Sequence, residues 1–150
     1  MEKEEILELR HTVQKFIRLF GLLEENVTPC GFALSPSQVF ALQELENQTL
    51  SMGELAERLL LERSSVSRLI DNLVKGGFIH RTLNEENRRE VLVSLTDKGC
   101  RSVQQVREQS LRFYQSILEQ VPEQDQYAVL KGFKLFTDSL NRVRSKTNER

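Results

Sequence analysis

The chain has 150 residues, of which 39% are hydrophobic and 29% are charged, and its formal net charge is −1 at pH 7. This composition is typical of one soluble globular domain and excludes a disordered chain. The near-neutral total also excludes a uniformly basic protein, so any nucleic-acid surface has to come from local charge. The charged amino-terminal residues are unlike a signal peptide, and no apolar run reaches the roughly 18 residues of a membrane span. We therefore expect a cytoplasmic protein without a membrane partner.

Apolar residues recur at alternating steps of three and four along the amino-terminal segment. They are Ile6, Leu9, Val13, Phe16, Phe20, Leu23 and Val27. This narrow seam is typical of a helix that packs against another helix. The pattern predicts a long first helix over about residues 3–28, ended by Pro29 and Gly31.

Two helix-start signals follow. In "SPSQ", Ser35 is expected to cap a helix with Gln38 as its reciprocal partner, and Pro36 occupies the first helical position. In "SMGE", Ser51 and Glu54 repeat the arrangement. These signals predict one helix through "VFALQEL" and a brief second helix through "ELAERLL".

The next stretch, "ERSSVSRLIDNLVKGGFIHR", places its apolar residues on one stripe of a helix. Those residues are Val66, Leu69, Ile70, Leu73 and Val74. The rest of the circumference is polar and consists of Ser64, Ser65, Ser67, Arg68, Asp71, Asn72 and Lys75. Serine lowers helix propensity, so its concentration on an outer face indicates contact with another molecule. Gly76 and Gly77 are expected to supply a left-handed stop.

The remaining chain predicts a hairpin and two helices. "FIHRTL" and "REVLVSL" are strand-like runs joined by the polar turn "NEENR". Thr96 opens a helix that Pro122 interrupts, and the last helix carries a seam to about residue 146. That seam consists of Val129, Phe133, Phe136, Leu140 and Val143. A short helix, an amphipathic helix and a hairpin in this order indicate a winged helix-turn-helix.

Local charge agrees with DNA binding by this module. Residues 63–89 hold six basic side chains against three acidic ones, an excess of three positive charges in a chain that is negative overall. Hydroxyls and an arginine near the start of the amphipathic helix suit base edges and phosphates in a major groove.

The segment from Leu50 to Gly99 resembles the core of the MarR family of bacterial transcriptional regulators, and the similarity covers about residues 35–100. Its most specific parts are the serine-bearing helix, the Gly-Phe-Ile-x-Arg entry to the hairpin, the arginine-tipped wing and the Leu-Thr-x-x-Gly exit. The resemblance implies a homodimer that grips an inverted DNA repeat, with a wing arginine in the minor groove. The family usually has aspartate two places before that arginine, where this chain has Asn87. The ion pair is therefore lost, and either Arg88 or Arg89 fits the wing position.

Together these features predict a mainly α fold with a small β-hairpin. One MarR-like domain would span residues 1–150, with a winged core at about 35–100 between dimerisation helices at about 3–28 and 100–146. The expected function is a sequence-specific DNA-binding regulator, a repressor by resemblance, on a near-palindromic operator. The residues assigned to DNA are Arg63, Ser64, Ser65, Ser67, Arg68, Arg88, Arg89, Ser37 and Gln38.

Several alternatives stay open at this point. The serines could be capping or solvated residues, the wing arginines a solvated turn, and the winged helix a protein-interaction module that binds no DNA. No catalytic motif appears, so we expect neither an enzyme nor a cofactor. His11 and His80 lack ligand spacing, and no metal site is expected. A small aromatic or lipophilic effector would be the trigger for DNA release, and oxidation of Cys30 is the rival trigger. Cys30 and Cys100 have no CxxC or Cys/His spacing, so we expect neither a zinc site nor a disulfide framework, and a redox switch at either thiol stays open.

Overall fold

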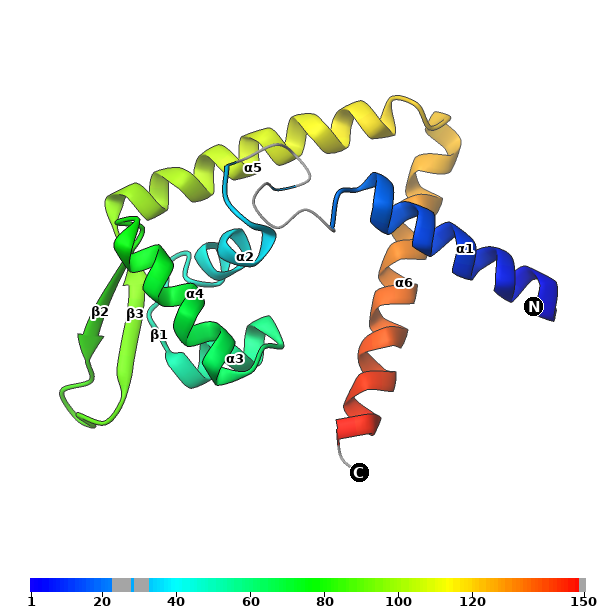
Figure 1. The fold of residues 1–150 in the computed structure, drawn as a ribbon. Coiled ribbons are helices and arrows are strands. Elements are labelled where there is room, and N and C mark those ends of the chain that lie inside the picture. The colour runs from blue at the N-terminus through cyan, green and yellow to red at the C-terminus, as the bar shows by residue number, and fades with distance from the viewer. Residues whose placement is uncertain (23–27, 29–32, 149–150) are drawn as a thin grey trace. The chain divides into compact units, whose positions relative to one another are not determined.

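The computed structural model describes residues 1–22, 28 and 33–148 (Figure 1). Its elements in chain order are α1 (Lys3–Leu19), α2 (Pro36–Glu44), β1 (Leu50–Ser51), α3 (Met52–Leu59), α4 (Arg63–Lys75), β2 (Ile79–Leu83), β3 (Val91–Leu95), α5 (Asp97–Leu118) and α6 (Glu123–Asn148). The prediction of a mainly α fold with a small hairpin is confirmed. The chain divides into two compact units, Met1–Ser110 and Leu111–Arg150, and α5 belongs to both.

Helix α1 is shorter than predicted. It ends at Leu19, and the prediction that the first helix continues to about residue 28 is wrong. Gly21 adopts a left-handed backbone with φ of 76°. Its N–H donates to the Arg18 carbonyl, and the Leu22 N–H donates to the Ile17 carbonyl, which is the Schellman pattern of a helix end. The apolar seam concealed this stop because its spacing continues through the glycine; Leu23 and Val27 lie outside the described residues.

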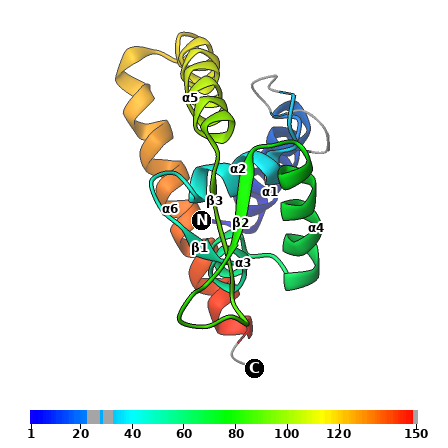
Figure 2. The same cartoon turned by 90° about the vertical axis from the view of Figure 1, so that its left-hand side faces the viewer.

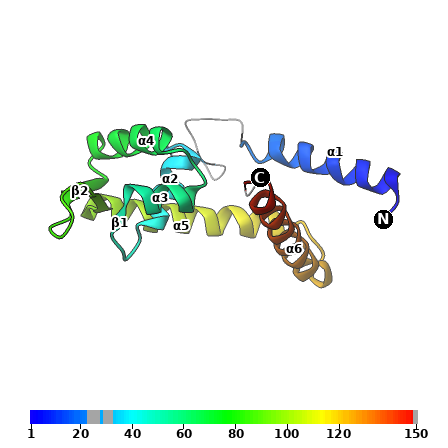
Figure 3. The ribbon, with the colours of Figure 1, turned by 90° about the horizontal axis from the view of Figure 1, so that it is seen from below.

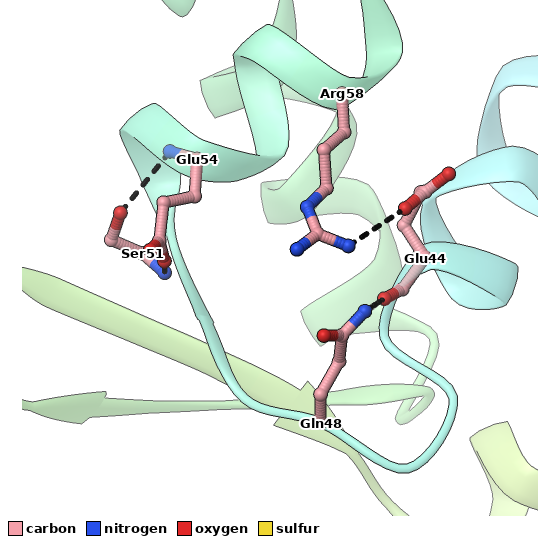
Figure 4. A network of polar contacts seen from close by, with 5 residues as sticks. All are labelled: Glu44, Gln48, Ser51, Glu54 and Arg58. Atoms are coloured by element: carbon pink, nitrogen blue, oxygen red, sulfur yellow. Dashed lines mark hydrogen bonds and ion pairs between the residues drawn. The ribbon is translucent and has the colours of Figure 1, made fainter.

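Both predicted capping boxes are confirmed. The Ser35 hydroxyl accepts from the Gln38 N–H at 3.2 Å, and the Gln38 side-chain oxygen accepts from the Ser35 N–H at 2.9 Å. Ser51 and Glu54 make the same reciprocal pair at 3.1 and 2.8 Å (Figure 4). These bonds satisfy donors that a helix start otherwise leaves free, and they set where α2 and α3 begin.

The sheet has three antiparallel strands in the order β1-β3-β2. The predicted hairpin is β2 and β3, with Ile79 opposite Leu95 and Leu83 opposite Val91. Sequence patterning did not predict β1, because two residues are too few to show alternation. The β2–β3 turn projects away from α2, α3 and α4 (Figures 1 and 2).

The core of the first unit lies between α2, α3, α4, the sheet and the start of α5. Its fully buried large side chains are Leu42, Leu45, Leu55, Ile70, Leu73, Val66 and Val93. Each such side chain contributes about 1.5–3 kcal/mol when it is removed from water. The ion pairs at the surface of this unit include Arg58 with Glu44 at 3.3 Å (Figure 4) and Arg107 with Glu46. The core thus holds α4 by its buried face, and the opposite face of the helix points outward.

The second unit comprises the end of α5 and helix α6. The Gln126 amide nitrogen donates to the carbonyls of Leu118 and Val121 at 3.1 and 3.3 Å, which closes the turn after α5. The predicted apolar seam is present on α6, and its side chains are exposed: Val129, Phe133, Phe136, Leu140 and Val143. A contiguous exposed apolar stripe is rare on a monomeric soluble protein and indicates an interaction surface.

Candidate nucleic-acid interface

A sharp turn joins α3 to α4. Leu60 adopts a left-handed backbone with φ of 55° and ψ of 38°, and the Leu61 N–H donates to the Ala56 carbonyl at 3.1 Å. Helix α4 can therefore begin at Arg63, directly after α3 ends. The short helix, the tight turn and the second helix form a helix-turn-helix, and Figure 3 shows α4 along one side of the first unit, beside α3.

Helix α4 has one buried and one outward face. Val66, Ile70 and Leu73 are buried in the core. The outward residues near the start of the helix are exposed; they are Ser64, Ser65, Ser67 and Arg68. Within the described part of the chain, none of these four side chains makes a hydrogen bond or an ion pair. The outward face predicted from the serine spacing is therefore available to a partner.

The amino end of α4 also has free main-chain donors. Its N-cap residue is Glu62, whose side chain makes no capping bond. The alternative that Ser64 or Ser65 serves as the cap is not what the fold shows, because both lie inside the first helical turn. N–H groups at an uncapped helix start, together with the helix dipole, favour a phosphate group.

Arg63, the first residue of α4, lies on the same exposed end. Its guanidinium is beside Gly53 of α3, where a Cβ would be 3.6 Å from Nη2. Ser37 is exposed on α2, whereas Gln38 is half-buried and its side-chain oxygen is engaged by the Ser35 N–H. Of the two α2 residues assigned to DNA, Gln38 thus has a structural role in its capping box, and its contact with DNA stays a prediction.

The hairpin turn is held by two asparagines. The Asn84 amide donates to Glu90 Oε2 at 2.7 Å, and the Asn84 oxygen accepts from the Glu86 N–H at 3.0 Å. The Asn87 oxygen accepts from the Arg89 N–H at 3.3 Å, so it supports the main chain of Arg89. Arg88 and Arg89 are both exposed on this turn.

The carboxyl end of α4 is attached to the start of α5 by a junction that the sequence did not reveal. Lys98 Nζ donates to the Gly76 carbonyl and Thr96 Oγ1 donates to the Gly77 carbonyl, each at 2.6 Å. Lys98 Nζ also lies 4.4 Å from the centre of the Phe78 ring. These contacts satisfy the last carbonyls of the helix and fix the base of the hairpin.

Only one of the two glycines at this junction has the predicted left-handed backbone. Gly77 has φ of 77°, whereas Gly76 is right-handed with φ of −73°, so the prediction for Gly76 is wrong. The bonds from the Gly77 N–H to Val74 and from the Phe78 N–H to Leu73 form a Schellman motif, which needs a single left-handed residue.

One ion pair connects α4 to the hairpin. Arg81 Nη2 on β2 contacts Asp71 Oδ1 on α4, and both side chains are partly exposed, at 40% and 46%. Both charges are evident in the sequence, but only the packing of β2 against α4 brings them together as a pair. Because the pair is neutral, the positive excess of this region comes from the other basic residues.

Among the described residues, no three His, Cys, Asp or Glu side chains gather in a group that would hold a metal ion. Cys100 is a free, exposed thiol, and Cys30, the candidate redox residue, lies outside the described residues. No helix in the described part of the chain combines the length and apolar character of a membrane crossing.

Comparison with known proteins places this module in a family. Residues 34–91 match the family model described as "MarR family". The uncharacterized HTH-type transcriptional regulator YfiV of Bacillus subtilis is 29% identical over 112 residues, which cover 74% of this chain and 70% of that protein. The HTH-type transcriptional repressor MdtR of Bacillus subtilis is 37% identical over 67 residues, or 44% of this chain and 43% of that protein. The chain thus spans less than half of MdtR.

Solved structures share the fold. FabT of Streptococcus pneumoniae, solved in complex with DNA, has a TM-score of 0.73 and 18% identity, covering 95% of this chain and 99% of that chain. BpsR of Bordetella bronchiseptica, whose DNA binding is regulated by 6-hydroxynicotinic acid, has a TM-score of 0.67 and 17% identity, covering 87% and 98%. At these identities the likeness shows the fold alone. With the family match and the helix-turn-helix relatives, residues 34–91 are similar to the MarR family of transcriptional regulators, and α3, α4 and the hairpin have the arrangement of a winged helix-turn-helix.

Proposed function

We propose that two copies of this chain bind a near-palindromic operator and repress transcription. The observation that carries the proposal is the outward face of α4, where Ser64, Ser65, Ser67 and Arg68 are exposed and unbonded within the described chain. Structural side chains on a solvated helix do not need this combination, because Ala, Glu or Lys would give a more stable helix.

In this proposal α4 lies in the major groove and the hairpin turn reaches the adjacent minor groove. Arg68 donates to a guanine edge, the serines let the helix approach closely, and the free N–H groups at the start of α4 contact a phosphate. Arg88 and Arg89 on the exposed turn suit a narrow minor groove, whose negative potential attracts arginine.

The second copy is inferred from the apolar stripes on the terminal helices. On α6 the side chains of Phe133 and Phe136 are 53% and 46% exposed, and on α1 Ile6 is 53% exposed. Covering such stripes by a second chain stabilises the assembly by about 25 cal/mol for each Å² of apolar surface removed from water. Two copies related by a twofold axis would present their α4 helices about 34 Å apart, one turn of duplex.

Release of DNA by a small aromatic or lipophilic effector belongs to the same proposal. A ligand acts only through unequal affinity for two spacings of the DNA-binding modules. BpsR, which shares the fold, has its DNA binding regulated by a small aromatic acid. That observation supports a ligand trigger for this chain and leaves the identity of the ligand to experiment. The family is one of transcriptional regulators and not of enzymes.

A mobility-shift and footprinting series on the DNA upstream of its own gene tests the proposal. We expect a shift that weakens steeply as salt rises, and a footprint with twofold symmetry. Arg68→Ala should reduce the free energy of operator binding by about 1–3 kcal/mol and relax base preference at one position in each half-site. Arg112→Ala, which removes an exposed arginine of α5, is the control.

Two results would contradict the proposal. Absence of a shift with any native duplex, together with a stable protein partner, would favour the winged helix as a protein-interaction module. Equal losses in the free energy of operator binding for Arg68→Ala and Arg112→Ala would mean that Arg68 does not read a base.

A further inference from the structure

We propose that Arg81 is a positioning residue that holds Asp71 away from Arg68 and so keeps the Arg68 guanidinium free to contact DNA. This inference rests on the proposed function, because it concerns the same face of α4. It assigns a role to an ion pair that lies beside the DNA-contacting residues and is not among them.

Helical spacing places Arg68 and Asp71 next to each other on the outward face of α4. Residues three and four apart are neighbours on a helix surface, so Ser64, Arg68, Asp71 and Lys75 form one outward row along α4. Asp71 is the only acidic residue between Arg63 and Lys75. An aspartate at i+3 from an arginine is a natural ion-pair partner for it. Without another partner, Asp71 would compete with DNA for Arg68.

The second step is the contact that the fold supplies. Arg81 Nη2 pairs with Asp71 Oδ1, whereas Arg68 makes no ion pair or hydrogen bond with any described residue. Arg81 lies two residues after the buried Ile79, and alternation along β2 places both on the face that packs against α4. Strand β2 therefore places the Arg81 guanidinium beside the Asp71 carboxylate, the one acidic group in the outward row.

The third step is the stiffness of the support. The base of β2 is fixed to α5, since the Phe78 carbonyl accepts from the Thr96 N–H at 3.0 Å and Lys98 Nζ holds the Gly76 carbonyl. A strand anchored this close to Arg81 holds that side chain beside α4 with little additional ordering. Arg81 can therefore engage Asp71 at a smaller entropic cost than a free side chain could.

The proposal is tested by rescue. Arg81→Gln should lower the ratio of operator to non-specific affinity about two- to fivefold, since an exposed ion pair of this kind is worth at most about a fivefold change. The double variant Arg81→Gln with Asp71→Asn removes the competing carboxylate and should restore the parent ratio. Arg58→Gln is the matched control: it removes one positive charge and breaks an equally exposed pair, with Glu44, that does not involve α4.

A second cycle locates the effect on Arg68. In an Arg68→Ala background, Arg81→Gln should cause no further loss of the ratio, because there is no guanidinium left to capture. Thermal unfolding of every variant, measured at one protein concentration, checks that the fold is intact.

The outcomes separate the possibilities. A double variant as weak as Arg81→Gln would mean that Arg81 contacts DNA itself, and a ratio for Arg81→Gln equal to that of Arg58→Gln would mean that the pair has no role; either overturns the inference. A parent protein that binds no duplex would refute the proposed function and this inference together.

Discussion

Replacement of Gly99 by alanine tests the junction that joins α4, the hairpin and α5. A Cβ at this position would lie 2.2 Å from the Phe78 carbonyl oxygen and 3.1 Å from Leu95 Cδ2. The nearer atom belongs to the main chain and cannot rotate away. The start of α5 and residue 78 would therefore have to separate, which strains or breaks the bond from the Thr96 N–H to the same carbonyl.

The cost can be worked from these contacts. Overpacking of a fitted site costs about 1–3 kcal/mol, and a lost hydrogen bond adds about 1 kcal/mol. Alanine returns up to about 1 kcal/mol through its better helix propensity. The free energy of unfolding should therefore fall by about 1–3 kcal/mol, which for a chain of this length corresponds to a decrease in Tm of roughly 3–10 °C.

The assay is thermal unfolding followed by circular dichroism at a fixed protein concentration. Gly53→Ala is the matched control, because a Cβ on that helical glycine meets only ordinary contacts, at 3.6 and 3.9 Å. Its Tm should stay unchanged or rise. Equal Tm values for Gly99→Ala and the parent would refute the reasoning about the junction.

Three further substitutions test other parts of the account. Leu60→Gly should raise the free energy of unfolding, measured by denaturant titration, by about 0.5–1 kcal/mol, since Leu60 is 65% exposed and its left-handed backbone suits glycine. A lower free energy of unfolding would show that the Leu60 side chain has a packing role. Phe136→Glu should convert a dimer to monomers in sedimentation velocity, because it places a charge on the α6 stripe. The control Lys131→Glu, on the opposite side of α6, should leave the dimer intact, and a Phe136→Glu variant that stays dimeric would contradict the second-copy proposal. Arg89→Ala should reduce the salt dependence of DNA binding by about one counterion and weaken the preference for A·T pairs under the wing. Arg88→Ala should have a smaller effect on both, and a larger effect of Arg88→Ala than of Arg89→Ala would assign the wing position to Arg88.

Elements with local signals could be predicted from the sequence. The capping boxes at Ser35 and Ser51 each depend on residues three apart, and the buried stripe of α4 depends on helical periodicity. The hairpin was recognisable because its strands alternate around a polar turn. These features are properties of short segments, so no knowledge of distant contacts was needed.

The contacts between distant segments could not be predicted. Arg81 and Asp71 are ten residues apart on different elements, and only the packing of β2 on α4 brings them together. The close approach of Gly99 to Phe78 depends on how α5 leaves the sheet, and β1 forms only because β3 is available as a partner. Gly21 is a local signal for the end of α1. The apolar spacing that continues beyond this glycine in the sequence indicates a longer helix and so conceals that signal.

The central claim is that the outward face of α4 reads bases in the major groove, twice in each assembly. Methylation interference on the operator tests it most directly, since a methyl group on guanine N7 blocks the edge that arginine contacts. The account predicts that methylation of one guanine in each half-site, one helical turn apart, weakens binding by the parent and not by Arg68→Ala. Binding of the parent that is insensitive to N7 methylation throughout the site would contradict it.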